Sequence, residues 1–488
     1  MIDDPRYTVE PWGIQETSLD LERLAQSESV FALSNGHIGV RGTLDEGEPH
    51  ALPGTYLNAF WEARPLPYAE AGFGYPEAGE TVVNMTNGKV IRLLVDDSPF
   101  DIRYGELLEH ERRLDFRTGI LRRDALWRSP TGKTVRVVSE RLVSFAQRAV
   151  MAIRYSVEPT AAPTRVVVQS ELVTNEPRPA ISKDPRAAAA LEAPLEAELW
   201  MGDDVRAVLV HSTKQSRLRG AAAMGHEVHG PGDCVVDQAE AWEDLGRLTI
   251  NATPAPGEPL TITKFVTYGW SARRSVPAMR DQVSAALAEA RHTGWEEICK
   301  AQREYLDDFW ERADVELDGD AELQQAVRFG LFHALQASAR GEGRAIPAKG
   351  LTGPGYDGHT FWDTEAYVLP MLSYAVPRAA AEALRWRLAT LGKARERARE
   401  LGLEGAAFPW RTISGAECGA YWPAGTAAFH INADIAQAVS RYCDINVDPD
   451  FERDVGLPLL VETARLWRSL GHHDAHGAFR IDGVTGPD

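Results

Sequence analysis

The spacing of the hydrophobic residues changes once along the chain, near residue 270, and this change limits the folds open to it. Before this point, β-branched and aromatic residues occur in short runs, such as 135–138 and 150–155, which is typical of strands. The turn sequence Ser-Pro-Thr-Gly at 129–132 precedes the first of these runs. Many short strands without intervening helices predict an antiparallel β-sandwich over residues 1–270. The stretch 175–194, rich in Pro, Ala and charge, is expected to be a surface loop.

After residue 275 the apolar residues recur at helical spacing. One helix is expected around Val283, and a second is expected to carry Tyr305 and Trp310. A third begins at Glu322, and its expected apolar face consists of Leu323, Val327, Leu331, Ala334, Leu335 and Ser338. The remaining predicted helices cover 377–400, 431–439 and 460–470.

Charge and composition exclude several classes of partner. The 52 basic and 71 acidic residues give a net charge of −19, which repels nucleic acid and anionic lipid. No apolar stretch approaches the roughly 18 residues of a membrane span, and the first residues lack the features of a signal peptide. The four cysteines show no C-x-x-C spacing, which argues against a zinc module or a disulfide framework. We therefore expect a cytoplasmic protein that binds a neutral small molecule, with no nucleic acid, membrane or metal partner.

Three loops of the helical half stand out, in a region whose loops are rich in Gly, Trp, Asp and His. They lie at 350–365, 408–417 and 483–488. A sugar presents apolar C–H faces and polar hydroxyls, which suit an indole plane beside a charged side chain. Trp362 next to Asp363 and Trp410 next to Arg411 are two such pairs. In the alternative interpretation each Trp fills a domain edge, and Asp363 caps a helix that begins at Thr364.

Four sequence blocks resemble glycoside hydrolase family 65. They are Phe-Trp-Asp-Thr-Glu at 361–365, Phe-Pro-Trp at 408–410, His-Ile-Asn-Ala-Asp-Ile at 430–435 and Ser-Asn-Gly-His-Ile-Gly-Val-Arg-Gly at 34–42. The family contains maltose, trehalose, kojibiose and nigerose phosphorylases together with some hydrolases. The resemblance runs in order along essentially the whole chain.

The resemblance implies a multidomain β + α fold. An N-terminal antiparallel β-sandwich at 1–270 is expected to lead through a helical linker at 271–318 into an (α/α)6 barrel at 319–488. The barrel is expected to be incomplete at its C-terminal end, and the family's small C-terminal β-domain is expected to be absent. Homodimers are expected from the family.

The resemblance also implies roles for particular residues. Trp362 and Asp363 match the residues that hold the glucosyl unit in the −1 subsite of relatives. Further residues expected near the pocket are His359, Trp410, Arg411 and Glu417. His430, Asn432 and Asp434 suit helix packing as well as sugar contact. The Asn35-Gly36-His37 block is either structural or a loop that reaches the active site.

The resemblance implies inverting phosphorolysis of an α-linked glucose disaccharide to β-glucose 1-phosphate and glucose. Inorganic phosphate is the expected co-substrate, with no other cofactor and no metal. Since phosphate is already an anionic nucleophile, such an enzyme needs one general acid and a phosphate cradle. The family's acid is the Glu that directly follows Gly-Pro-Asp, here Gly486, Pro487 and Asp488. No catalytic acid is therefore expected within 1–488, and these residues alone are expected to be inactive.

Two alternatives stay open. An inverting hydrolase of the same family would use a second, downstream carboxylate to activate water. A non-catalytic carbohydrate-binding protein would bind a disaccharide without turnover. The disaccharide linkage cannot be assigned from these residues.

Overall fold

The computed structural model describes residues 6–66, 72–177, 191–419 and 426–486. Of the predicted surface loop at 175–194, residues 178–190 therefore lie outside the described residues. The chain forms two compact units. The first, here called the β unit, consists of Met1–Phe60, Val83–Ile181 and Ala190–Gln336. The second, here called the helical unit, consists of Trp61–Val82, Ser182–Ala189 and Ala337–Asp488.

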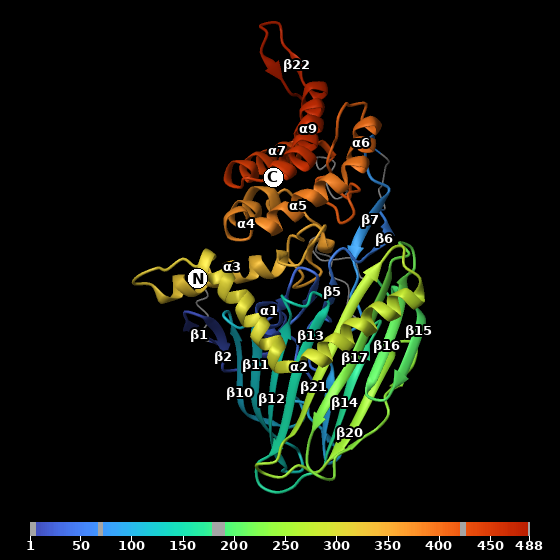
Figure 1. Cartoon of the computed structure of the whole chain (residues 1–488), viewed down its shortest axis with the longest axis vertical. Coiled ribbons are helices and arrows are strands. Elements are labelled where there is room, and N and C mark those ends of the chain that lie inside the picture. Colours follow the sequence, from blue (N-terminus) through green and yellow to red (C-terminus); the bar gives the residue numbers. More distant parts are fainter. Residues whose placement is uncertain (1–5, 67–71, 178–190, 420–425, 487–488) are drawn as a thin grey trace. The chain divides into compact units, whose positions relative to one another are not determined.

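The larger sheet of the β unit has ten antiparallel strands. Their bounds are β1 Tyr7–Glu10, β2 Gly13–Glu16, β10 Glu106–Asp115, β11 Ile120–Arg128, β12 Thr134–Val143, β13 Val150–Pro159, β15 Leu195–Asp203, β16 Arg206–Thr213, β17 Arg219–His229 and β21 Leu260–Ser271. The order across the sheet is β1-β2-β10-β11-β12-β13-β21-β17-β16-β15 (Figure 1). The predicted turn at 129–132 joins β11 to β12, with Gly132 N–H donating to the carbonyl of Ser129.

A second antiparallel sheet contributes another layer. Its strands are β8 Ile91–Val95, β9 Ser98–Pro99, β14 Val166–Val173, β18 Val235–Val236, β19 Glu240–Ala241 and β20 Leu245–Ala252. Strand β20 packs against β15 and β16 of the larger sheet. Buried and partly exposed residues alternate along β20, so one face points into the core. A three-stranded sheet consists of β3 Leu33–Ser34, β4 Ile38–Val40 and β5 Thr55–Leu57.

Helix α2, Val276–Ala313, covers one face of the larger sheet and packs on β13, β16, β17 and β21 (Figure 1). Met279, Val283 and Leu287 join the core between helix and sheet. Gly294 breaks the helical backbone with a φ of 74° and a ψ of 166°. The two predicted helices around Val283 and Trp310 are therefore consecutive segments separated by this glycine.

Helix α3, Ala321–Ser338, buries a face that matches the predicted one only in part. Leu323 is 50% exposed, whereas Gln325 and Arg328 are buried. The Gln325 amide donates to the carbonyls of Thr8 and Gly13, and Arg328 pairs with Asp314. The prediction holds for Leu335 and Ser338, which are buried, and is wrong for Leu323, because Gln325 and Arg328 satisfy backbone and carboxylate groups in the β unit. Two short helical segments, η1 Leu21–Arg23 and α1 Leu24–Val30, complete the helices of this unit.

The described helices of the helical unit share a hydrophobic core. Its helical segments are η2 Gly355–Gly358, η3 Thr364–Val368, α4 Leu369–Ala375, α5 Pro377–Ala389, α6 Leu391–Glu400, α7 His430–Ile445, α8 Pro449–Phe451, η5 Glu452–Gly456 and α9 Leu457–Leu470. Leu372, Leu384, Ile435 and Leu459 are fully buried where α4, α5, α7 and α9 meet. The predicted helices at 431–439 and 460–470 are confirmed as α7 and α9.

The predicted single helix over 377–400 is interrupted at Thr390. The backbone there has a φ of −92° and a ψ of 0°. The Thr390 hydroxyl donates to the carbonyl of Arg387 at 2.9 Å. Such a local side-chain bond competes with helix continuation, so α5 ends at Ala389 and α6 begins at Leu391.

Two antiparallel hairpins also belong to the helical unit. They are β6 Trp61–Pro65 with β7 Ala78–Val82, and β22 His472–His473 with β23 Phe479–Arg480. The first comes from the N-terminal part of the sequence, which was predicted to be purely a β-sandwich. No helix in the described ranges is both long and apolar enough to cross a membrane. The fold class is confirmed as an antiparallel β-rich part followed by a helical part, whereas the boundaries at 270 and 318 stay predictions.

Candidate functional site

The loop before Trp362 makes a left-handed turn. Tyr356, Asp357 and Gly358 have φ angles of 54°, 58° and 76°. This backbone is uncommon for residues other than glycine, and surrounding contacts must hold it in place. A Cβ on Gly358 would lie 2.6 Å from the Cβ of Val82 in β7, so no side chain fits there. The turn is therefore built closely against the β6–β7 hairpin.

Asp357 is fully buried and ties this turn to two other segments. Its carboxylate accepts hydrogen bonds from Arg64 Nη2 at 3.1 Å and from Thr81 Oγ1 at 3.2 Å. It also accepts from Arg411 Nη2 at 3.2 Å. Arg64 and Thr81 lie in β6 and β7, and Arg411 lies in the second loop. Because the buried carboxylate meets two guanidinium groups, its charge is compensated where water cannot solvate it.

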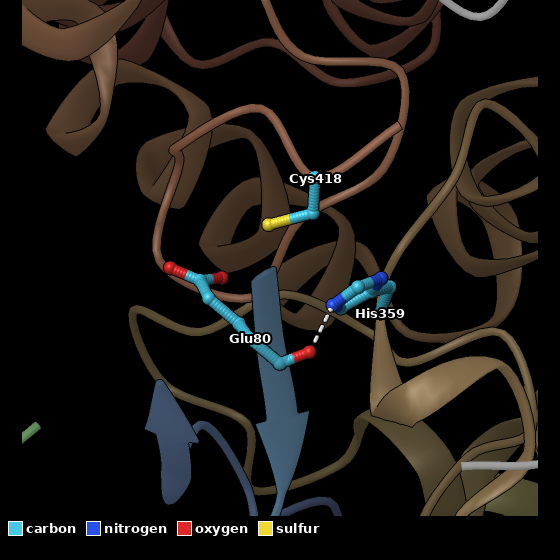
Figure 2. A group of neighbouring side chains, drawn as sticks. All are labelled: Glu80, His359 and Cys418. Carbon is cyan, nitrogen blue, oxygen red and sulfur yellow. Dashed lines mark hydrogen bonds between the residues drawn. The ribbon is translucent and has the colours of Figure 1, made fainter. Parts of the chain in front are cut away.

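His359 has both ring nitrogens engaged. Arg411 Nε–H donates to Nδ1 at 2.6 Å, so the ring proton lies on Nε2, which donates to the carbonyl of Glu80 at 2.6 Å (Figure 2). Burial, followed by the nearby Arg411 charge, lowers the pKa of His359 well below 6.5. The imidazole is therefore neutral and fixed in one tautomer. His359 lies next to the predicted site but faces protein groups in this structure.

Among the described residues, Glu80, His359 and Cys418 form the one group with metal-ligand spacing, with one ligand atom of each within 4.8 Å of the others (Figure 2). The Glu80 carboxylate already accepts from the backbone N–H groups of Ile413 and Ser414 and from the Ser414 hydroxyl. Burial raises the pKa of the Cys418 thiol well above 9, whereas a metal requires the thiolate. The two His359 nitrogens are also occupied, so the donor set does not suit a metal ion.

The second loop is closed by Glu417. Its carboxylate accepts from the backbone N–H groups of Trp410 at 2.8 Å and Gly419 at 2.7 Å. Burial raises the pKa of Glu417 above its usual value. Both carboxylate oxygens of Glu417 therefore bond to backbone groups of this part of the chain.

The two loops are joined to each other. Thr360 and Thr412 form an isolated antiparallel bridge, with N···O distances of 2.9 and 3.3 Å. The rings of Phe361 and Trp410 meet edge to face, with centroids 5.2 Å apart. The Nε1 of Trp410 is buried and has no hydrogen-bond partner among the described residues.

Trp362 and Asp363 lie at the end of the first loop. The Trp362 ring is half-buried and contacts the rings of Tyr367 and His430. Asp363 is exposed, and its side chain makes neither a helix cap nor another hydrogen bond within the described part of the chain. The capping alternative for Asp363 is therefore not observed. A half-buried indole beside an exposed carboxylate suits a sugar ring, and the assignment of both residues to the −1 subsite stays a prediction.

The helix block at 430–435 divides into packing and site-facing residues. Asn432 is fully buried, where its Oδ1 accepts from Phe408 N–H and its Nδ2 donates to the Phe429 carbonyl. Asn432 therefore supports the second loop. His430 instead contacts Trp362 and donates from Nδ1 to Asp434 Oδ2 at 3.0 Å.

The Asn35-Gly36-His37 block has a structural environment within the β unit. Asn35 is fully buried, and its Oδ1 accepts from the N–H groups of His37 and Ile38. Its Nδ2 donates to the carbonyls of Ser144 and Arg148. All the hydrogen-bonding capacity of this side chain is therefore used locally, which favours the structural interpretation.

The third loop is described only as far as Gly486, and Pro487 and Asp488 lie outside the described residues. Its Thr485 N–H donates to the carbonyl of Ala427, just before α7. The expectation that a catalytic Glu follows Asp488 is therefore not tested here.

A cleft of about 580 Å³ lies between α6 and the second loop. Lys393, Arg397, Pro409 and Glu417 are among its lining residues, whereas Trp362 and Asp363 are not. Lys393 Nζ donates to Ser414, and Arg397 donates to the carbonyl of Gly74. Because both cations already bind protein oxygens, the cleft is a poor phosphate cradle.

Arg64, Glu80 and Thr81 were not predicted from the sequence. These residues contact the first and second loops from the β6–β7 hairpin. Hundreds of residues separate them from their partners, and no local motif marks them. Only the tertiary structure brings them to the site.

The fold and the candidate site are consistent with an enzyme that acts on carbohydrates. The N-terminal domain of glycosyl hydrolase family 65 matches residues 14–309, and the central catalytic domain of that family matches residues 328–488. The chain belongs to glycosyl hydrolase family 65.

Among its relatives, an uncharacterized glycosyl hydrolase of Mycobacterium tuberculosis is 62% identical over the whole chain. The alpha,alpha-trehalose phosphorylase of Thermoanaerobacter brockii is 36% identical over 99% of the chain. The chain spans 62% and 63% of the lengths of these two proteins. A candidate kojibiose phosphorylase from the human microbiome has a solved structure that matches with a TM-score of 0.88 and 25% identity, covering 99% of this chain and 63% of that one.

Proposed function

We propose that the full-length protein catalyses the phosphorolysis, with inversion, of an α-linked glucose disaccharide. The products would be β-glucose 1-phosphate and free glucose. The observation that carries this proposal is the pair formed by half-buried Trp362 and exposed, unengaged Asp363. The indole offers a flat apolar surface to the glucosyl ring, and the carboxylate accepts hydrogen bonds from its hydroxyls.

The reaction requires one chemical step from the protein, the transfer of a proton. A phosphate oxygen attacks the anomeric carbon as the glycosidic bond breaks, and a general acid transfers a proton to the departing oxygen. The acid is expected to be the Glu after Asp488, so the described residues supply sugar binding and not the proton. No metal or other cofactor enters this scheme.

The relatives favour one substrate over the others. Two trehalose phosphorylases are 36% and 35% identical to the chain, a maltose phosphorylase is 29% identical, and two kojibiose phosphorylases are each 26% identical. We therefore propose α,α-trehalose as the substrate. A homodimer is proposed on the family resemblance, and a cytoplasmic location on the cysteine pattern, which fits a reducing compartment.

The test is an assay of the full-length protein with trehalose, maltose, kojibiose and nigerose, each with and without inorganic phosphate. We expect glucose 1-phosphate and glucose in equal amounts from trehalose, and no reaction without phosphate. Glucose release in phosphate-free buffer would identify a hydrolase instead. Calorimetric binding of a disaccharide without turnover would identify a carbohydrate-binding protein.

A further inference from the structure

The β6–β7 hairpin lies beside both loops of the candidate site, although it comes from the N-terminal part of the sequence. We propose that this hairpin positions the glucosyl-binding loop, with Arg64, Thr81 and Glu80 as positioning residues. The proposal rests on the proposed function, because it takes Trp362 and Asp363 as the glucosyl contacts.

The first connection runs through Asp357. Arg64 Nε donates to Thr81 Oγ1 at 3.0 Å, and this hydroxyl donates in turn to Asp357 Oδ1 at 3.2 Å. Arg64 Nη2 also reaches Asp357 Oδ2 directly at 3.1 Å. Side chains of both hairpin strands therefore hold the one carboxylate at the centre of the left-handed turn. The turn lies only a few residues before Trp362 and Asp363.

The second connection runs through Glu80, which binds both loops at once. Its carbonyl accepts from His359 Nε2 in the first loop. Its carboxylate accepts from the N–H groups of Ile413 at 2.7 Å and Ser414 at 2.9 Å in the second loop. One residue of β7 therefore fixes the separation of the segments that carry Trp362 and Trp410.

The left-handed turn depends on these hairpin contacts for a physical reason. Non-glycine residues in left-handed conformation persist only where their surroundings determine them. With the hairpin contacts removed, Tyr356 and Asp357 gain access to more favourable backbone angles, and Trp362 and Asp363 shift with the loop. A displacement of about 1 Å in a substrate-positioning group can cost roughly 100-fold in rate.

Two substitutions in the full-length enzyme test the proposal. Thr81→Val removes the hydroxyl that links Arg64 to Asp357, and Arg64→Met removes the guanidinium. The matched control is Thr463→Val, since Thr463 is similarly buried in the same unit but its hydroxyl bonds only within α9, to the carbonyls of Leu459 and Leu460. The three variants are compared by amide hydrogen exchange, by steady-state kinetics with disaccharide and phosphate, and by thermal unfolding.

We expect at least about tenfold faster exchange at Thr360 and Thr412 in both hairpin variants, with exchange in α7 unchanged. We also expect the KM for disaccharide to rise about tenfold, while the KM for phosphate stays the same. A purely structural role would lower the active fraction and the melting temperature without moving the KM for disaccharide. Such a result, or exchange and KM equal to those of Thr463→Val, would overturn the proposal.

Hydrogen exchange separates this proposal from the proposed function. If the wild-type protein turned over no disaccharide, the proposed function would fail, whereas faster exchange in the hairpin variants would still show that the hairpin holds the loops. Normal turnover in the wild type with unchanged exchange in both hairpin variants would reject the positioning role alone.

Discussion

The indole of Trp362 meets the imidazole of His430 edge to face, with ring centroids 5.3 Å apart and an interplanar angle of 88°. Asp434 accepts from Nδ1 of the same imidazole at 3.0 Å, which fixes the orientation of the ring. Aromatic contacts of this geometry contribute about 0.5–1.5 kcal/mol beyond burial. His430 therefore holds the plane on which the sugar is proposed to lie.

Replacing His430 tests this contact. We expect His430→Ala to lower kcat/KM for the disaccharide by about tenfold, which corresponds to ~1.4 kcal/mol. His430→Phe keeps an aromatic edge against Trp362 and should stay within about threefold of the wild type. Equal losses in both variants would show that the imidazole itself contacts substrate, and no loss in either would remove His430 from the site.

A substitution of Asn35 tests whether the Asn35-Gly36-His37 block is structural or is a loop that reaches the active site. Asn35→Ala removes the four hydrogen bonds that its side chain makes with two backbone N–H groups and two carbonyls. We expect the free energy of unfolding to fall by about 3 kcal/mol, while kcat/KM of the folded enzyme stays within about twofold of the wild type. The control is Asn251→Ala, at a partly exposed position of β20. Lost activity at unchanged stability would instead support a loop that reaches the active site.

Two buried lysines give the β unit a pH-dependent stability. Burial lowers the pKa of Lys89 and of Lys264 from 10.5 to about 7. Between pH 7 and 10.5 the unfolded chain therefore binds more protons than the folded chain, so the free energy of unfolding rises with pH across this window. The limit is about 1.4 kcal/mol per pH unit for each lysine.

Lys264→Met removes one of these groups, along with its hydrogen bonds to the carbonyls of Val90 and Glu171. We expect the variant to show about half the wild-type rise in stability between pH 7 and 9, measured by denaturant unfolding. Lys214→Met, at an exposed position, should keep the wild-type slope. A slope unchanged in Lys264→Met would contradict the assignment of this pH dependence to the buried ammonium groups.

Local sequence patterns predicted the strands and most helices well. The β-branched run at 135–138 lies in β12, and the turn at 129–132 connects it to β11. The interruption at Thr390 escaped prediction because threonine is acceptable within helices, and only its bond to Arg387 marks the break. The burial of polar residues of α3 was not predicted, because Gln325 and Arg328 bind backbone groups that lie more than three hundred residues away in the sequence.

The candidate site was predictable only in part. Adjacent Trp and Asp residues, together with the family resemblance, predicted Trp362 and Asp363 as sugar contacts. In the structure Trp362 is half-buried and Asp363 is exposed, and their contact with sugar stays a prediction. The same reasoning grouped His359, Arg411 and Glu417 with them, but their side chains bind Glu80, Asp357 and backbone N–H groups. Residue type alone does not separate a side chain that contacts sugar from one that holds the loop, because both roles use the same polar groups.

Asp363 tests the central claim most directly. Asp363→Asn is compared with wild-type full-length enzyme and with Asp444→Asn, which changes another exposed aspartate of the helical unit. The measured quantity is kcat/KM for phosphorolysis of α,α-trehalose. We predict a loss of at least about 100-fold in Asp363→Asn, with an unchanged melting temperature, because the side chain makes no hydrogen bond within the described residues. Near-normal kcat/KM in Asp363→Asn would contradict the account.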